Sequence, residues 1–286
     1  MKILDPHLHL FDLTLGQYSW LKPENAPYWP DKALINRNFN ESDLMLEPPL
    51  QLWGFVHIEA GFDNLAPWRE IEWLEATCQL PFRSVACVHL DAESAEFDAQ
   101  LVKLVNMTSV VGVRHILDQQ ATELLSRPDI VTKFRKIAEA DLHFELQVSV
   151  MDTEVIDLIL ALLPKLSSLK FVLNHAGFPP YATQAESLAW RQWHDNLTRL
   201  AHYPNVYFKC SGFEMVERNY EPNWQQTVLA AGVELFGLQR VMVASNFPLC
   251  QFSSTYSAYW QQTLKIAEPK ESELLFKNAY KFYRFA

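Results

Sequence analysis

Short apolar segments alternate with helical patterns along the whole chain. Segments rich in β-branched and aromatic residues recur eight times, at Ile3–Leu10, Leu52–Ala60, Phe82–Leu90, Val110–Leu117, Leu142–Ser149, Leu169–His175, Asn205–Ser211 and Arg240–Asn246. Several are near-continuous apolar runs, which is typical of strands buried on both faces. Apolar residues recur at three- and four-residue intervals, as in amphipathic helices, at Ala66–Gln79, Ala95–Asn106, Ile130–Asp141, Glu154–Leu163, Ser187–His202, Trp224–Phe236, Tyr256–Ala267 and Lys270–Tyr283. This alternation predicts an α/β fold with a parallel sheet, and the number of strands favours a closed (β/α)8 barrel over a doubly wound open sheet.

One long segment interrupts the alternation. Residues from about 11 to 50 carry several prolines and aromatic residues but little periodicity. A loop after the first strand of a barrel lies on the C-terminal face, where active sites sit, so this segment is a candidate lid or pocket wall. The alternative is a surface loop that its aromatic side chains merely anchor. We find no internal repeat and no linker, and we therefore expect residues 1–286 to form a single domain.

Composition excludes several classes of partner. The chain has 24 Lys and Arg against 34 Asp and Glu, a formal net charge of −10, which argues against nucleic acid and against anionic lipid. We find neither a membrane-spanning run nor a secretory signal. The four cysteines have no paired short spacing and are interpreted as reduced thiols. These features predict a cytoplasmic protein that acts on a small molecule and could form a homo-oligomer.

Histidines gather where a barrel would place its active site. Of nine in the chain, six fall in the C-terminal half of a predicted strand: His7, His9, His57, His89, His115 and His175. Residues two apart on a strand share a face, so His7 and His9 would point the same way, together with Asp5. Two neutral imidazoles at that spacing can share one divalent metal. Asp5 could orient a histidine, or it could be a buried structural carboxylate.

Further polar residues stand near the ends of other predicted strands. Arg114 could clamp a carboxylate, and Lys209 could act in the same way. His57 shares a face of the second strand with Glu59, and Glu145 shares a face of the fifth with Gln147. For the arginine, the lysine and the glutamates among these residues the alternative is a structural ion pair.

Five motifs in order carry a resemblance to a known family. They are Asp5-Pro-His-x-His-x-Phe-Asp12, Gly112-Val-Arg114, His175-x-Gly-x-Pro179, Lys209-x-Ser-Gly212 and Ser245-Asn-Phe-Pro248. This order resembles the amidohydrolase superfamily, in particular the lactonase branch that includes 2-pyrone-4,6-dicarboxylate lactonase and L-fuconolactonase. The resemblance implies a distorted (β/α)8 barrel that opens lactone rings, with or without a divalent metal such as zinc or manganese.

The resemblance also implies roles for individual residues. His7 and His9 match the histidine pair of the first strand, which holds the metal when there is one. His175 matches the histidine near the substrate carbonyl or the metal, and Arg114 matches a position suited to a substrate carboxylate. Asn246 matches the position where the characterised lactonases have an aspartate that takes a proton from water.

Asn246 is the departure from the family pattern. A carboxamide has no basic site near neutral pH, and loss of a general base ordinarily costs about 10²–10⁴-fold in rate. Asp5, Glu145, Glu59 or a neutral histidine could be the base instead. Alternatively, Asn246 donates a hydrogen bond to a developing oxyanion, or the barrel binds a ligand without turning it over.

We therefore predict a hydrolase that opens a small sugar-acid or pyrone lactone. His175, Asn246 and Asp5 are the predicted catalytic residues, and His7 and His9 are the predicted metal ligands. The predicted substrate-binding residues are Arg114, Lys209, His57 and Glu145. The alternatives are a metal-dependent decarboxylase on the same barrel and a non-catalytic sugar-acid-binding barrel.

Overall fold

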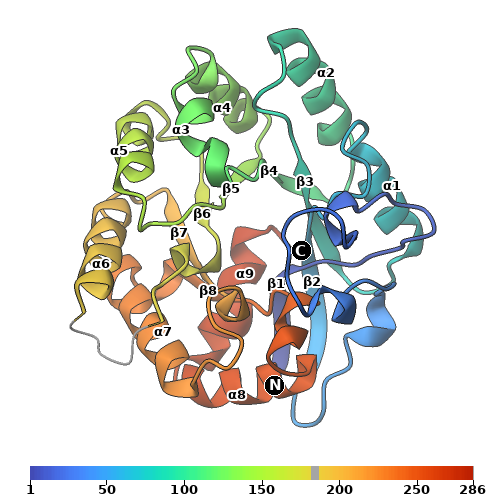
Figure 1. Ribbon diagram of the computed structural model, residues 1–286, viewed down its shortest axis with the longest axis vertical. Coiled ribbons are helices and arrows are strands. Elements are labelled where there is room, and N and C mark those ends of the chain that lie inside the picture. The colour runs from blue at the N-terminus through green and yellow to red at the C-terminus, as the bar shows by residue number, and fades with distance from the viewer. Residues whose placement is uncertain (182–186, 286) are drawn as a thin grey trace.

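The computed structural model describes residues 1–181 and 187–285, and their strands form one parallel sheet of eight. Each strand pairs with the next along the chain, in the order β1 (Lys2–Leu8), β2 (Gln51–Ile58), β3 (Phe82–Cys87), β4 (Val110–Arg114), β5 (His143–Leu146), β6 (Phe171–Leu173), β7 (Val206–Cys210) and β8 (Val241–Val243). Helices surround the strands (Figure 1). The predicted (β/α)8 barrel is confirmed.

The helices lie close to their predicted positions. They are α1 (Trp68–Thr77), α2 (Ser94–Val105), α3 (Ala121–Leu125), α4 (Ile130–Glu139), α5 (Thr153–Leu162), α6 (Leu188–Ala201), α7 (Pro222–Phe236), α8 (Tyr256–Ala267) and α9 (Asn278–Phe282). The short helix α3 was not predicted. The helix predicted over Lys270–Tyr283 is present as one continuous helical run, in which a π-helical turn at Glu273–Lys277 leads directly into α9. No helix within the described ranges is both long and apolar enough to cross a membrane.

The barrel closes between the segments that follow β1 and β8. Leu8 forms a parallel bridge with Phe247, the His9 amide donates to the Phe247 carbonyl at 2.7 Å, and the Asn246 amide donates to the His7 carbonyl at 2.9 Å. These bonds place His7, His9 and Asn246 side by side.

Apolar side chains from the strands fill one end of the barrel interior. Leu4, Val56, Val85, Val111, Val172 and Met242 form one buried cluster with Ala279, Phe282 and Tyr283 at the C-terminal end of the chain. Close packing of such branched residues makes a barrel interior a solid core rather than a pore. The polar site is therefore confined to the other end.

Strand β1 departs from regular alternation. Its pairing with β2 shifts register between Asp5 and Leu8, and such an irregularity redirects side chains. Asp5 accepts hydrogen bonds from Ser245 Oγ at 2.5 Å and from Tyr256 Oη of α8 at 3.1 Å. His7 instead lies against His9 and His175. The prediction that Asp5 faces the site together with both histidines is therefore wrong, because the strand is not regular there.

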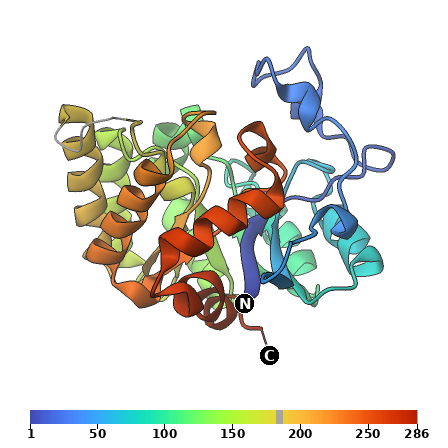
Figure 2. The same cartoon turned by 90° about the horizontal axis from the view of Figure 1, so that it is seen from below.

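The long segment between β1 and β2 lies at the carboxyl ends of the strands. Figure 2 shows part of it (blue) projecting beyond the helices, at the opposite end from the start of β1. Trp20 Nε1 donates to the Ala60 carbonyl at 2.7 Å, which ties the segment to the end of β2. Phe11 and Phe39 exchange two backbone hydrogen bonds and close the segment on itself.

Candidate active site

A cavity of about 990 Å³ opens at the carboxyl ends of the strands. Six side chains from these ends lie on its wall: His9, Glu59, Arg114, Gln147, His175 and Asn246. The long segment adds Trp20, Ala26, Pro27 and Trp29. Of the two interpretations offered for that segment, the structure supports the pocket wall.

Three buried histidines form a cluster at the cavity, with His9 and His175 on its wall. The ring centroid of His7 lies 5.1 Å from that of His9 and 4.7 Å from that of His175. His9 Nδ1 lies 2.7 Å from the Ile58 carbonyl, so it carries the proton and Nε2 keeps its lone pair. His7 Nε2 is buried without a hydrogen-bond partner in the described part of the chain.

These histidines are neutral at physiological pH. Burial lowers the pKa of each one well below its ordinary value. Positive charge adds to the effect, chiefly from Lys209 for His7 and from Arg114 for His9 and His175. Neutral imidazoles can bind a metal or donate one hydrogen bond.

The backbone is unusual at two of the site residues. His175 has φ of 52° and Asn246 has φ of 58°, in the left-handed region that few residues other than glycine adopt, with asparagine and histidine among the more tolerant. Gly212 follows β7 and packs directly against His175, because a Cβ at position 212 would lie only 2.5 Å from His175 Nδ1. Ser211 Oγ lies 3.2 Å from the same nitrogen.

Asn246 contacts a carboxyl group that the sequence analysis missed. Its Nδ2 donates to Glu214 Oε1 at 2.5 Å. Glu214 lies in the 3-10 turn η7 (Phe213–Met215) after β7, and it is fully buried. Burial raises the pKa of Glu214 to about 7, against the opposing effect of the hydrogen bond from Asn246. Its only sequence signal was its place two residues beyond the Lys-x-Ser-Gly motif.

Arg114 is already paired within the protein. Its Nε donates to Glu59 Oε1 at 2.8 Å, its Nη2 to the Glu59 carbonyl at 2.8 Å, and its Nη1 to Gln147 Oε1 at 2.9 Å. The Arg114 and Glu59 side chains are only 4% and 7% exposed. Arg114 therefore reaches the wall as half of a neutral ion pair.

Lys209 and Glu145 form a second buried pair. Lys209 Nζ lies 2.9 and 2.8 Å from the two carboxylate oxygens and 3.4 Å from His7 Nδ1. Burial alone would raise the pKa of Glu145, but Lys209 and His143 outweigh it and lower it to about 2. Neither Lys209 nor Glu145 lies on the cavity wall, so the structure does not place them where the predicted substrate contact would be made.

His57 and Asp5 also lie away from the wall, because their polar atoms are used elsewhere. His57 Nδ1 accepts from the Leu10 amide at 3.2 Å, and its Nε2 lies 3.0 Å from Glu70 Oε1. Asp5 accepts from two backbone amides in addition to Ser245 and Tyr256. Burial raises the pKa of Asp5 to about 6, with the Ser245 hydrogen bonds opposing it. These contacts suit structural roles better than the predicted substrate-binding and catalytic ones.

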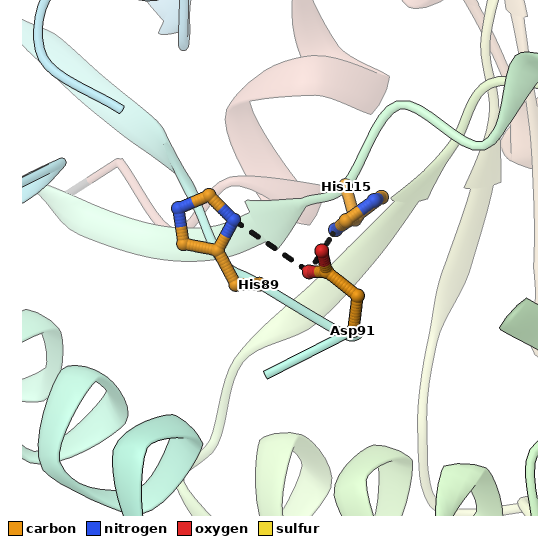
Figure 3. Close-up of side chains that lie close together, drawn as sticks. All are labelled: His89, Asp91 and His115. Carbon is orange, nitrogen blue, oxygen red and sulfur yellow. Dashed lines mark ion pairs between the residues drawn. The ribbon is translucent and has the colours of Figure 1, made fainter. Parts of the chain in front are cut away.

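His89, Asp91 and His115 form a separate group (Figure 3). One potential metal-ligand atom of each side chain lies within 4.8 Å of those of the other two. Asp91 Oδ1 lies 3.8 Å from His89 Nδ1 and 4.0 Å from His115 Nδ1. That His115 nitrogen also lies 3.0 Å from the Val88 carbonyl and 3.1 Å from the Leu90 amide. Because this His115 nitrogen already contacts the backbone, a metal that bound to it would have to displace the Val88 carbonyl and the Leu90 amide.

A known enzyme family matches almost the whole barrel. The family model described as "Amidohydrolase" matches residues 4–285, and the chain belongs to this family. It is 27% identical over 301 residues to an uncharacterized protein of Sinorhizobium fredii, covering 99% of this chain and 98% of that one. It is 24% identical over 255 residues to an L-fucono-1,5-lactonase of Burkholderia ambifaria, covering 87% and 84%. The crystal structure of a zinc-bound amidohydrolase from Burkholderia multivorans superposes with a TM-score of 0.80 at 20% identity, covering 99% of both chains.

Proposed function

We propose that this enzyme hydrolyses an uncharged, hydroxyl-rich lactone of the sugar-acid type. One observation favours a neutral lactone over a pyrone dicarboxylate. Arg114 supplies the guanidinium on the described cavity wall, and Glu59 neutralises its charge. Asp118 and Asp152 add two further carboxyl groups to the wall. An anionic substrate would meet excess negative charge there, which disfavours it relative to a neutral one.

The other wall residues suit a sugar ring. Trp20 and Trp29 offer apolar faces, and Asn64, Gln119 and Ser149 offer donors and acceptors. A mainly apolar wall with a few polar groups is the usual way to orient a small ligand. We therefore assign Arg114 to shaping this wall through Glu59 and Gln147, rather than to binding a substrate carboxylate.

His175 would polarise the lactone carbonyl. Its Nδ1 can accept from Ser211 Oγ, which leaves the proton on Nε2 for donation to the carbonyl oxygen. A neutral imidazole can stabilise a developing oxyanion in this way. The strained backbone at His175 fits a residue that the fold holds in one functional position.

His7 near the end of β1 and His9 just after it fit a divalent metal. His7 Nε2 is a buried atom without a partner, and His9 Nε2 keeps a free lone pair. These two nitrogens would hold the ion, which when bound supplies Lewis-acid polarisation of the carbonyl and acidifies water. In a metal-free enzyme, His9 Nε2 would itself take the proton of the attacking water.

Acid release from a panel of lactones tests this proposal. We expect turnover of neutral sugar-acid lactones in preference to 2-pyrone-4,6-dicarboxylate, and loss of turnover in the His7→Ala/His9→Ala variant. Chelation before the assay separates the two roles of His9. Preferential turnover of the dicarboxylate would overturn the substrate class. Carbon dioxide release would identify a decarboxylase, and thermal stabilisation by a lactone that is not turned over would identify a binding protein.

A further inference from the structure

Glu214 is a buried acid for which the reaction described above has no use. Its side chain is fully buried, and Oε2 has no hydrogen-bond partner within the described chain. The Arg218 guanidinium lies nearby but donates to the Glu214 backbone carbonyl and pairs with Asp31. Leaving a buried polar atom unpaired costs free energy, so such a group calls for an explanation.

The Asn246 amide at the site is also incompletely paired. Nδ2 donates to Glu214, whereas Oδ1 is buried without a partner among described residues. Asn246 and His9 are neighbours where the barrel closes, and both line the cavity. Because Nδ2 is turned to Glu214, Oδ1 is the end of the Asn246 amide that is left toward His9. Because His9 Nδ1 carries the proton, its Nε2 is an acceptor as well, and two acceptors oppose each other.

We propose that Glu214 is the positioning residue for Asn246: the Glu214 carboxyl group decides which end of the Asn246 amide faces His9. When Glu214 is ionised, it accepts from Nδ2 and Oδ1 is turned to His9. When Glu214 is protonated, it can donate to Oδ1, and the NH2 group then donates to His9 Nε2. The second arrangement pairs the atoms that the first leaves opposed.

The surroundings of Glu214 allow it to change its protonation near neutral pH. The charged or titratable side chains that act on it or respond to it are Arg218, Tyr220, Cys250 and Tyr259. Burial raises the pKa of Tyr220, Cys250 and Tyr259, so these three groups stay neutral. When Glu214 is protonated, the Asn246 NH2 group therefore donates a hydrogen bond to His9. When Glu214 is ionised, Asn246 Oδ1 faces His9 instead and would stabilise a positive charge at His9 Nε2.

Glu214 also explains why an aspartate at position 246 would not act as a base. A carboxylate there would lie within hydrogen-bond distance of the Glu214 carboxyl group, and two such groups share one proton with a raised pKa. The site therefore holds its carboxyl group at position 214 and an amide at 246.

The decisive measurement is the pH dependence of the ¹⁵N signal of His9 Nε2 in metal-free protein between pH 5 and 9. His9 itself does not titrate in this range, because its pKa lies well below its ordinary value. We expect a shift in wild type that follows one proton, its absence in Glu214→Gln, and its retention in the matched control Glu217→Gln. A wild-type signal that does not move would overturn the proposal, even if Glu214→Gln fails to fold.

A second arm rests on the proposed function and measures turnover of the preferred lactone against pH. We expect Asn246→Asp to lose about tenfold or more near neutral pH, and Asn246→Asp/Glu214→Gln to recover most of that loss, because only one carboxyl group then remains. Equal loss in both variants would overturn the coupling. If wild type turns over no lactone, the proposed function fails, whereas the histidine signal still tests the role of Glu214.

Discussion

Lys209 of β7 and Glu145 of β5 form an ion pair inside the barrel although their strands are separated by β6 in the sheet. Both side chains are 0% exposed. Tyr283 Oη, which follows α9, donates to Glu145 Oε1 at 2.7 Å. The pair therefore links two strands to the C-terminal end of the chain at the boundary between the apolar core and the histidine cluster.

Breaking this pair should destabilise the fold. Lys209→Met leaves the Glu145 carboxylate buried without its cation, and loss of one partner of a buried pair costs about 3–5 kcal/mol. We expect this loss in the free energy of unfolding measured with urea, and substantial recovery in Lys209→Met/Glu145→Gln. A fully stable Lys209→Met protein that no longer binds the lactone would instead support the predicted substrate contact.

Glu214 should make stability fall as pH rises. Its pKa is about 7 in the folded protein against an ordinary value of 4.5, so the folded state binds more protons between these values. The stabilisation is complete below about pH 4.5 and is lost as pH rises through 7, by about 3 kcal/mol in all. Subtracting the unfolding curves of Glu214→Gln from those of wild type should reveal this slope. A pH-independent difference would show that Glu214 does not titrate there.

Removing the His175 imidazole should act on the chemical step. We expect His175→Ala to lower kcat by about 10²–10³-fold with little change in KM, because its hydrogen bond strengthens only as charge develops on the oxygen. Steady-state kinetics on the preferred lactone measure this. His202→Ala, at an exposed position on the outer ring, is the control and should match wild type. A raised KM with unchanged kcat would limit His175 to ground-state binding.

Trp29 should contribute binding without chemistry. It lines the cavity and packs against Trp20 and Phe252. Trp29→Ala should raise KM about tenfold while kcat stays nearly constant, since the contact is made equally before and during the reaction. Tyr28→Ala is the matched control, because this neighbour is 75% exposed. Equal effects of both variants would contradict a specific role for Trp29.

The barrel could be predicted from sequence because each strand is an apolar run and a helical pattern follows it along the chain. The position of Asp5 could not, since a register shift in β1 leaves no trace in the alternation of residue types. Arg114 and Lys209 illustrate a second limit: the sequence shows a cation near a strand end, but not the Glu59 or Glu145 that neutralises it. Glu214 was missed because a turn, rather than a strand, carries it to Asn246.

The two tryptophans that line the cavity come from a different part of the fold from the residues proposed to do chemistry. Trp20 and Trp29 come from this segment, whereas His7, His175 and Asn246 are set by the closure and strand ends of the barrel. Loops tolerate exchange and insertion far more readily than buried strands. Descendants of this chain could therefore acquire new substrates by altering residues 11–50 while inheriting the reactive centre intact, and grafting that segment between relatives is a direct route to altered selectivity.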